Sequence, residues 1–484
     1  MRIDTNVKLL IYRRTKIVAT LGPSSGDAAT IRQLIQAGVN VFRLNMSHGT
    51  HEGHRDVYHR VRRAATELEM PVAVLADLCG PKIRVGAFAG GGVQLEEGAA
   101  VTVTTRAVTG TPALIPSQYP ALNSDVSPGN RILLDDGNIE LRVDSVEGKD
   151  IACTVVAGGR LSDHKGMNLP GASVSAPSLT EADQVDAAFA LSLGVDFIAL
   201  SFVRRAADIE ALKALIDAAG AHTAVVAKIE KPEALENIDG ILDTADAIMV
   251  ARGDLGVELP PQTVPAAQDQ LIEQARRYRK PVIVATQMLE SMITHPRPTR
   301  AEVSDVATAV RAGADAIMLS AETASGKYPV ESVKMMDGIA RQTEGHLWRL
   351  GVFGSLARKP EGERPYPVED ALSEAMAKLS RDLLARSIIV ISEQDRSLSV
   401  MSASRPAAPI IGFCPDYRRT GISCLLWGVI PVAVDPHELR DPHALARSIV
   451  IQRGIAATGD TILVVKGFSA VAAENTPSVT IVTV

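Results

Sequence analysis

The chain has few aromatic residues and few cysteines, and each shortage excludes some structural classes of protein. Phe, Trp and Tyr make up only 4% of the sequence, whereas the hydrophobic fraction reaches 46%. A composition rich in Ala, Val, Ile and Gly is typical of α/β enzymes and disfavours all-β or fibrous proteins. The four cysteines are widely separated and form no CxxC pair: Cys79, Cys153, Cys414 and Cys424. We therefore expect reduced thiols of a cytosolic protein, with neither a disulfide framework nor a zinc site.

Long apolar runs and an excess of basic residues are also absent. The net charge of −6 argues against a general nucleic-acid binder, which is usually basic. No run approaches the roughly 20 apolar residues of a membrane span, and the N-terminal segment lacks the apolar core of a signal peptide. We expect a cytoplasmic protein with no nucleic-acid or membrane partner. A chain of 484 residues is too long for one hydrophobic core, so about two to four domains are expected.

A short pattern recurs along the chain and predicts the fold. A helix-like stretch ends in Gly38, Gly194 or Gly313, and an apolar strand begins shortly afterwards. Glycine just past a helix adopts the left-handed conformation that turns the chain back. Eight apolar strands alternate with mostly helical segments, which include residues 180–192, 205–219, 262–279 and 299–312. This alternation predicts a (β/α)8 barrel, in which the active site lies at the C-terminal ends of the strands.

The alternation is interrupted twice. After Asp77 come about 90 residues of short alternating runs separated by Gly, Asp and Pro, which predict an inserted β-domain that acts as a lid over the barrel mouth. A polar segment near Lys359 is interpreted as a linker to a separate C-terminal α/β domain. The predicted boundaries are 1–80 and 173–352 for the barrel, 81–172 for a small β-barrel lid, and 353–484 for a regulatory domain.

Three of the apolar strands end in polar side chains. One ends in Lys228 and Glu230, the next in Arg252 and Asp254, and the third in Thr286. Unpaired charge is costly at a buried strand, so such groups usually bind a metal or an anion or take part in chemistry. Lys228 and Glu230 share one strand face, and with Asp254 they offer two carboxylates to an octahedral Mg²⁺. The alternative is a Lys–Glu ion pair that only closes the strand end.

Other polar groups follow neighbouring strands. Arg43, Asn45 and Ser47 alternate with apolar residues and therefore share a face, which either lines the barrel mouth or is half-exposed. Gly253 allows a tight turn whose amides can hold a carboxylate. The hydroxyl of Thr286 can bind substrate or pass a proton through water, although a Thr in a strand is more often only a β-former. The third strand and the turn after it add Asp77, Lys82 and Arg84.

Longer motifs resemble signature segments of the pyruvate kinase family. They read TKIVATLGPSS, VFRLNMSHGTHEGH, VARGDLGVELP and ATQMLESMITHPRPTRAEVSDVATAV, and the resemblance extends over barrel, lid and C-terminal domain in the family's order. The resemblance implies a phosphotransferase that passes the phosphoryl group of phosphoenolpyruvate to ADP, giving ATP and pyruvate in the last step of glycolysis. It also implies Mg²⁺ as the cofactor, with Mn²⁺ as a substitute, and a homotetramer.

The resemblance further implies roles for individual residues. Lys228 would stabilise the phosphoryl group in flight, and Glu230 and Asp254 would hold Mg²⁺. The substrate carboxylate would lie at the amides of Gly253 and Asp254, and Thr286 would help to bind it and join the proton relay. Phosphate and nucleotide contacts are implied for Arg43, His48, Arg84 and Arg205. A monovalent-cation pocket is implied for Asn45, Ser47, Asp77 and the carbonyl of Leu78.

The chain departs from the common family pattern after the third strand. Many members have Thr, Glu and Thr where this chain has Leu78, Lys82 and Val85, and those members need K⁺. A fixed ammonium at Lys82 can supply the charge that K⁺ would bring, and the same companions occur in members without that requirement. We therefore predict activity without K⁺. The alternative is that Lys82 only faces solvent.

The C-terminal domain of the family usually binds a sugar-phosphate activator in a Ser/Thr-rich loop. Here that loop reads SEQDRS, from Ser392 to Ser397, and contains Glu393 and Asp395. Acidic side chains repel a bisphosphate, so we do not expect activation by fructose 1,6-bisphosphate. Another sugar-phosphate or nucleotide effector can still use this domain.

Two other interpretations remain open. A barrel lyase or aldolase acting on a pyruvate enolate also needs Mg²⁺ and two carboxylates, but it needs neither a lid nor the basic set of Arg43, Arg84 and Lys228. A non-catalytic regulatory paralogue is expected to have lost one of four residues, yet all four are present: Lys228, Glu230, Asp254 and Thr286.

Overall fold

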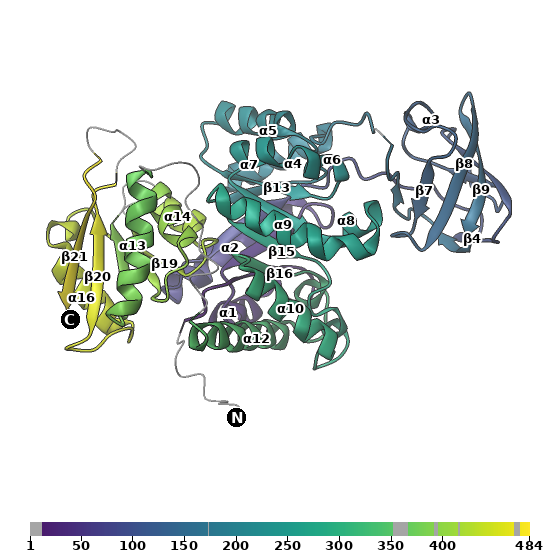
Figure 1. Cartoon of the computed structure of the whole chain (residues 1–484). Helices are drawn as coiled ribbons and strands as arrows, with labels where there is room; N and C mark the ends of the chain where they lie inside the picture. The colour runs from purple at the N-terminus through teal and green to yellow at the C-terminus, as the bar shows by residue number, and fades with distance from the viewer. Residues whose placement is uncertain (1–11, 173, 352–365, 392–394, 415–416, 469–474) are drawn as a thin grey trace.

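The centre of the molecule is a closed barrel of parallel strands (Figure 1). The computed structural model describes residues 12–172, 174–351, 366–391, 395–414, 417–468 and 475–484. The barrel strands follow the order β1-β16-β15-β14-β13-β12-β3-β2. Their bounds are β1 (Lys16–Thr20), β2 (Val41–Asn45), β3 (Ala73–Asp77), β12 (Phe197–Leu200), β13 (Ala224–Ile229), β14 (Ala247–Ala251), β15 (Val282–Ala285) and β16 (Ala316–Leu319). The predicted (β/α)8 barrel is confirmed.

The barrel strands are apolar on both faces because both faces are covered. Val41 belongs to the cluster inside the barrel, whereas its neighbour Phe42 packs against the surrounding helices. Side chains two residues apart share a strand face, so Arg43 continues the inward face of Val41. The interior of the barrel is therefore apolar along most of its length, and charged side chains enter it where the strands end and at Lys16, the first residue of β1.

Helices cover the outside of the barrel and begin and end at the expected signals. Gly38, Gly194 and Gly313 have φ values of 109°, 77° and 92°, the left-handed region predicted for them. The helices of the barrel are α1 (Ala28–Gln36), α2 (His51–Glu67), α4 (Glu181–Leu193), α5 (Ala206–Ala218), α6 (Pro232–Glu236), α7 (Ile238–Thr244), α8 (Arg252–Glu258), α9 (Val264–Arg277), α10 (Arg300–Ala312), α11 (Ala321–Ala324) and α12 (Pro329–Arg349), with 3-10 turns η1 (Pro261–Thr263) and η2 (Glu290–Ile293).

The inserted segment after β3 forms a separate β-domain, as predicted. Its strands divide into a two-stranded sheet, β10-β4, and a six-stranded sheet, β11-β7-β8-β9-β5-β6, around one apolar core. The bounds are β4 (Gly92–Leu95), β5 (Ala100–Thr104), β6 (Leu114–Pro116), α3 (Leu122–Asp125), β7 (Arg131–Leu134), β8 (Ile139–Glu147), β9 (Asp150–Ala157), β10 (Gly159–Ser162) and β11 (Met167–Asn168).

The C-terminal domain is an α/β unit around the sheet β19-β18-β17-β20-β21, in which only β21 runs antiparallel to its neighbour. Its elements are α13 (Val368–Asp382), β17 (Ile388–Ile391), α14 (Asp395–Ala403), β18 (Ile410–Cys414), α15 (Tyr417–Ser423), β19 (Val429–Ala433), η4 (Glu438–Arg440), α16 (Pro442–Gln452), β20 (Thr461–Lys466) and β21 (Ser478–Thr483). The predicted linker near Lys359 and the first half of the acidic effector loop, residues 392–394, lie outside the described residues. The domain boundaries given above stay predictions.

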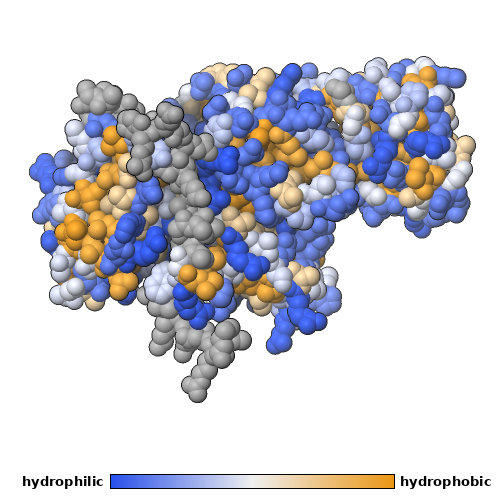
Figure 2. Space-filling view, in the orientation of Figure 1, coloured by the Kyte–Doolittle hydropathy of each residue, from blue (hydrophilic) through white to orange (hydrophobic). Residues whose placement is uncertain are grey.

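The two additional domains lie on opposite sides of the barrel (Figure 1). Cys424 and Leu425 of the C-terminal domain join the apolar cluster inside the barrel, and the Cys424 thiol lies 3.5 Å from the carbonyl of Pro71, just before β3. This domain therefore closes the N-terminal end of the barrel and leaves the C-terminal end to the inserted domain. In the view of Figure 2, apolar side chains gather on the C-terminal domain, and the inserted domain is more hydrophilic.

Two further expectations concern the whole chain. All four cysteines are free thiols, and Cys153, Cys414 and Cys424 are buried. Across the described residues, no helix combines the length and the apolar character that crossing a membrane requires.

Candidate active site

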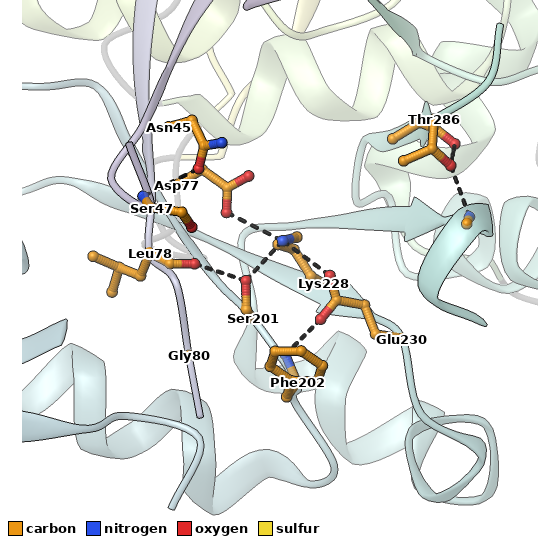
Figure 3. Close-up of polar contacts among 12 residues, drawn as sticks. Asn45, Ser47, Asp77, Leu78, Gly80, Ser201, Phe202, Lys228, Glu230 and Thr286 are labelled. Atoms are coloured by element: carbon orange, nitrogen blue, oxygen red, sulfur yellow. Dashed lines mark hydrogen bonds and ion pairs between the residues drawn. The ribbon is translucent and has the colours of Figure 1, made fainter. Parts of the chain in front are cut away.

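Four charged side chains meet where β2, β3 and β13 end. Figure 3 shows three of them, Asp77, Lys228 and Glu230. The ammonium of Lys228 lies 2.9 Å from Glu230 Oε1 and 3.3 Å from Asp77 Oδ1. The second oxygen of Asp77 lies 2.6 Å from Nε of Arg43, whose guanidinium also donates to the hydroxyl of Thr20. The inward orientation of Arg43, one of two options left open by its spacing, is thus the one adopted.

Burial and pairing together set the protonation of this cluster. Burial alone would lower the pKa of Lys228, but the carboxylates of Asp77 and Glu230 outweigh it and raise the pKa above its ordinary value. Burial would likewise raise the pKa of Asp77, but Lys228 and Arg43 reverse this and hold that pKa below its usual range. Lys228 is therefore a permanent cation at neutral pH, and Asp77 is a permanent anion.

The neighbouring carboxylates suit a divalent cation. Burial raises the pKa of Glu230, Lys228 opposes this, and the negative charge of Asp254 raises it further. A cation between Glu230 and Asp254 would relieve this repulsion, and the hard oxygen atoms of the two carboxylates suit Mg²⁺. Among the described residues, no group of three or more His, Cys, Asp or Glu side chains could enclose a metal. A metal here would therefore need substrate or water for its other positions.

Ser201 was not anticipated, although it touches the centre of the site. It follows β12, accepts a hydrogen bond from the Lys228 ammonium at 2.7 Å and donates one to the carbonyl of Leu78 at 2.7 Å. The next amide, of Phe202, donates to Glu230 Oε2 at 2.8 Å. The available signal was a polar residue at the end of an apolar run, the same signal that identified Lys228.

Thr286 and α8 form the other wall of the site. The amide of Gly253 donates to Thr286 Oγ1 at 2.8 Å, and that hydroxyl donates to the carbonyl of Ala285 at 2.6 Å. Thr286 has φ = 69°, a conformation that a β-branched residue rarely adopts. Arg252 holds this conformation, because it donates to the Thr286 carbonyl at 2.7 Å and pairs with Asp305 at 2.7 Å. Strain of this kind is typical of functional sites.

Several predicted residues are not drawn into the cluster. Lys82 is exposed at the hinge of the inserted domain, and within the described part of the chain its ammonium has no carboxylate partner. Arg84 donates to the carbonyl of His164, inside the inserted domain. His48 and Arg205 are exposed. The predicted cation-pocket residues lie along the turns after β2 and β3, where Asn45 Oδ1 accepts the amide of Ser47 at 3.2 Å and the carbonyl of Leu78 already accepts Ser201.

Comparison with known proteins agrees with this architecture. The family model described as "Pyruvate kinase, barrel domain" matches residues 12–333, and the one described as "Pyruvate kinase, alpha/beta domain" matches residues 370–482. The chain is 43% identical to pyruvate kinase 2 of Synechocystis sp. over 474 residues, which cover 93% of this chain and 79% of the relative. It is 42% identical to the pyruvate kinase of Mycobacterium tuberculosis over 460 residues, covering 94% and 95%.

A third relative extends the comparison. The pyruvate kinase of Geobacillus stearothermophilus is 42% identical over 460 residues, which cover 94% of this chain and 78% of the relative. The similarity extends through the barrel, the inserted domain and the C-terminal domain, and it favours phosphoryl transfer over the lyase alternative. The buried cation flanked by carboxylates, the strained threonine and the three-part architecture have one common explanation: the chain belongs to the pyruvate kinase family of phosphotransferases.

Proposed function

We propose that the chain transfers the phosphoryl group of phosphoenolpyruvate to ADP, producing ATP and pyruvate. The observation that carries the proposal is the buried ammonium of Lys228, held between Asp77 and Glu230 at the barrel mouth. A fixed cation in a site of low dielectric stabilises charge that develops on a transferring phosphoryl group better than water does. Arg43 and, from the hinge of the inserted domain, Arg84 add positive charge for the phosphates, and His48 and Arg205 contact the nucleotide.

The reaction separates into two bond changes. The bond from phosphorus to the enol oxygen breaks as a bond forms to an oxygen of the ADP β-phosphate, and the departing group is the enolate of pyruvate. The enolate carbon then takes a proton. Lys228 is a poor donor for this proton because its pKa is raised. The hydroxyl of Thr286, which already relays hydrogen bonds between Gly253 and Ala285, is the better placed group to pass a proton from water.

Substrate and metal share the remaining groups. We place the substrate carboxylate beside Gly253, Asp254 and Thr286, on the wall opposite Lys228. Glu230 and Asp254 would hold Mg²⁺ or Mn²⁺. When bound, the metal supplies positive charge against the phosphates. Glu230 is kept in place by the amide of Phe202, so its orientation does not depend on the metal.

A coupled assay for pyruvate tests the proposal. We expect pyruvate formation from phosphoenolpyruvate and ADP that requires Mg²⁺, and a fall in kcat of at least about 100-fold in Lys228→Met. Lys213→Met is the matched control, because Lys213 pairs with Asp246 at the other end of the barrel. An inactive wild-type protein, or a K228M variant as active as K213M, would overturn the proposal.

We also propose that the enzyme needs no K⁺. The support is chemical: Lys82 stands at the hinge of the inserted domain, so closure of this domain can bring its ammonium to the pocket of Asn45, Ser47, Asp77 and Leu78. We expect full activity in sodium- or Tris-based buffer, and a K⁺ requirement in Lys82→Glu. Near-zero wild-type activity that KCl restores would sink this idea.

Fructose 1,6-bisphosphate is not expected to activate the enzyme. The sequence has two acidic residues in the effector loop, Glu393 and Asp395, and negative charge there disfavours binding of a bisphosphate. The saturation curve for phosphoenolpyruvate should therefore be the same with and without micromolar fructose 1,6-bisphosphate. A strong leftward shift of that curve would contradict the prediction and would identify this sugar phosphate as the effector.

We further propose a cytoplasmic homotetramer. The support is the membership of the chain in the pyruvate kinase family, which implies this assembly. Light scattering on the purified protein measures the assembly directly, and a monomer at micromolar concentration would exclude it.

A further inference from the structure

Glu258, the last residue of α8, joins three segments that are distant in the sequence. Its Oε1 atom lies 2.6 Å from the ammonium of Lys231 and accepts a hydrogen bond from the side-chain amide of Asn168 at 3.1 Å. Lys231 directly follows the proposed metal ligand Glu230, and Asn168 ends β11, the last strand of the inserted domain. One carboxylate thus connects the barrel mouth, α8 and the inserted domain.

The pair is buried, unlike an ordinary surface salt bridge. The side chains of Lys231 and Glu258 are 11% and 2% exposed, and the ring of Phe202 lies 5.9 Å from the ammonium. A buried ion pair persists only where its geometry is good and further hydrogen bonds satisfy its atoms. The amide of Asn168 supplies such a bond. The positions of the two charged groups are therefore strongly constrained, and so is the position of Asn168, which is hydrogen-bonded to one of them.

The inserted domain reaches α8 at a second point. A Cβ atom built on Gly137, in the turn between β7 and β8, would lie 3.8 Å from a methyl group of Val257. Asn168 pairs with Leu133 of β7 in the same sheet, so Asn168 and the turn at Gly137 belong to one sheet of the inserted domain. Movement of this domain must therefore either carry the C-terminal end of α8 with it or break the hydrogen bond between Asn168 and Glu258 and separate Gly137 from Val257.

The other end of α8 forms part of the proposed active site. Gly253 donates to Thr286, and Arg252 is held by Asp305 and by the Thr286 carbonyl. The helix has seven residues, so its two ends are only about 10 Å apart. A shift at Glu258 is thus transmitted over a short, stiff element to Gly253 and Asp254.

We propose that Glu258 is a positioning residue that couples the inserted domain to α8, so that the orientation of this domain and the geometry at Gly253 and Asp254 change together. The proposal rests on the proposed function only in treating Gly253 and Asp254 as substrate-facing. The hydrogen bond between Asn168 and Glu258 transmits the coupling, and the ion pair with Lys231 holds the Glu258 carboxylate in position.

Hydrogen exchange in Asn168→Ala tests the coupling without any substrate. This change removes one hydrogen bond and leaves the Lys231–Glu258 pair intact. We expect exchange about fivefold faster in peptides that cover residues 166–172 and also in those that cover 252–258, because one hydrogen bond of ordinary strength is lost. Unchanged exchange in 252–258 would overturn the proposal, since a purely local role for Asn168 would loosen the inserted domain alone.

Asn123→Ala is the matched control. The side-chain amide of Asn123 donates to the carbonyl of Gly148 within the inserted domain, and among the described residues no hydrogen bond joins it to the barrel. This variant should leave exchange in 252–258 at the wild-type rate. Equal acceleration in both variants would show general loosening of the inserted domain and would refute a specific link through Glu258.

Kinetics supply a second measurement. In Asn168→Ala we expect KM for phosphoenolpyruvate to rise about fivefold, with kcat within about twofold of wild type. The reason is that the change displaces Gly253 and Asp254, which bind substrate in the proposed function, and leaves Lys228 in place. Glu258→Ala should have a larger effect, and adding Asn168→Ala to it should change nothing more. Additive effects in the double variant, or a loss confined to kcat, would contradict the coupling. An inactive wild type would refute the proposed function while the exchange result stands independently.

Discussion

At the scale of single residues, the site depends on shared partners. Asp77 lies against both Arg43 and Lys228, and Lys228 lies against Asp77, Glu230 and Ser201. Each charge thus has more than one neighbour, so loss of a neutral partner should weaken the site without dismantling it. Ser201 is the neutral member of this set and the most informative one to change.

Ser201→Ala should lower kcat/KM about fivefold. The substitution removes the 2.7 Å hydrogen bond from Lys228 and frees the Leu78 carbonyl, and one such bond contributes about 1 kcal/mol. Steady-state assays with varied phosphoenolpyruvate measure the change. The control is Ser192→Ala, whose hydroxyl donates to Phe189 at the end of α4. Wild-type kinetics in S201A would show that the hydroxyl does not position the ammonium.

At the scale of secondary-structure elements, the N-terminus of α4 holds the turn after β3, next to the site. Asp183, in the first turn of α4, closes a capping box with Thr180 and also accepts the amide of Gly80 at 3.0 Å. Gly80 lies two residues after Leu78, in the turn that carries the proposed cation pocket. A second capping box, formed by Thr299 and Glu302, starts α10.

Asp183→Asn should lower both stability and activity, whereas Thr299→Ala should lower stability alone. The Asp183 carboxylate is 1% exposed, and both of its oxygen atoms accept hydrogen bonds. In Asp183→Asn an amide NH2 group, which cannot accept a hydrogen bond, replaces one of these oxygen atoms. We expect this to lower the free energy of unfolding by about 2 kcal/mol and to disturb the turn at Gly80. Loss of the Thr299 cap costs about 1 kcal/mol. Urea unfolding and the pyruvate assay separate the two effects. Equal activity in both variants would mean that α4 does not support the pocket.

At the scale of the whole molecule, buried polar contacts attach the C-terminal domain to the N-terminal end of the barrel. Arg405, at the end of α14, pairs with Asp315 at 2.8 Å, and both side chains are nearly inaccessible. Arg405 also lies 5.0 Å from the ring of Trp427. The ammonium of Lys16, at the start of β1, donates to the carbonyl of Val429. Such an interface favours a rigid unit of barrel and C-terminal domain.

Lys16 should make stability depend on pH in the alkaline range. Burial lowers the pKa of Lys16 to about 8 from 10.5, so between these values the unfolded chain binds a proton that the folded chain does not. Stability conferred by this group therefore rises with pH across that window, by up to about 3 kcal/mol. Lys16→Met removes the dependence. Urea unfolding from about pH 7 to about pH 10 measures the free energy of unfolding of both proteins. We expect this free energy to rise with pH in the wild type relative to Lys16→Met, and a difference that stays constant with pH would contradict the lowered pKa.

The sequence by itself determined the barrel, the two additional domains and the grouping of Lys228 with Glu230. These features are encoded locally: apolar runs of strand length, glycines after helices, and side chains two residues apart on one face. Only the tertiary structure decided which groups those charges meet. Ser201, the link from Glu258 to Asn168, and the pair of Arg405 with Asp315 join segments far apart in the chain, and such contacts depend on the register and packing of whole elements, which no local pattern records.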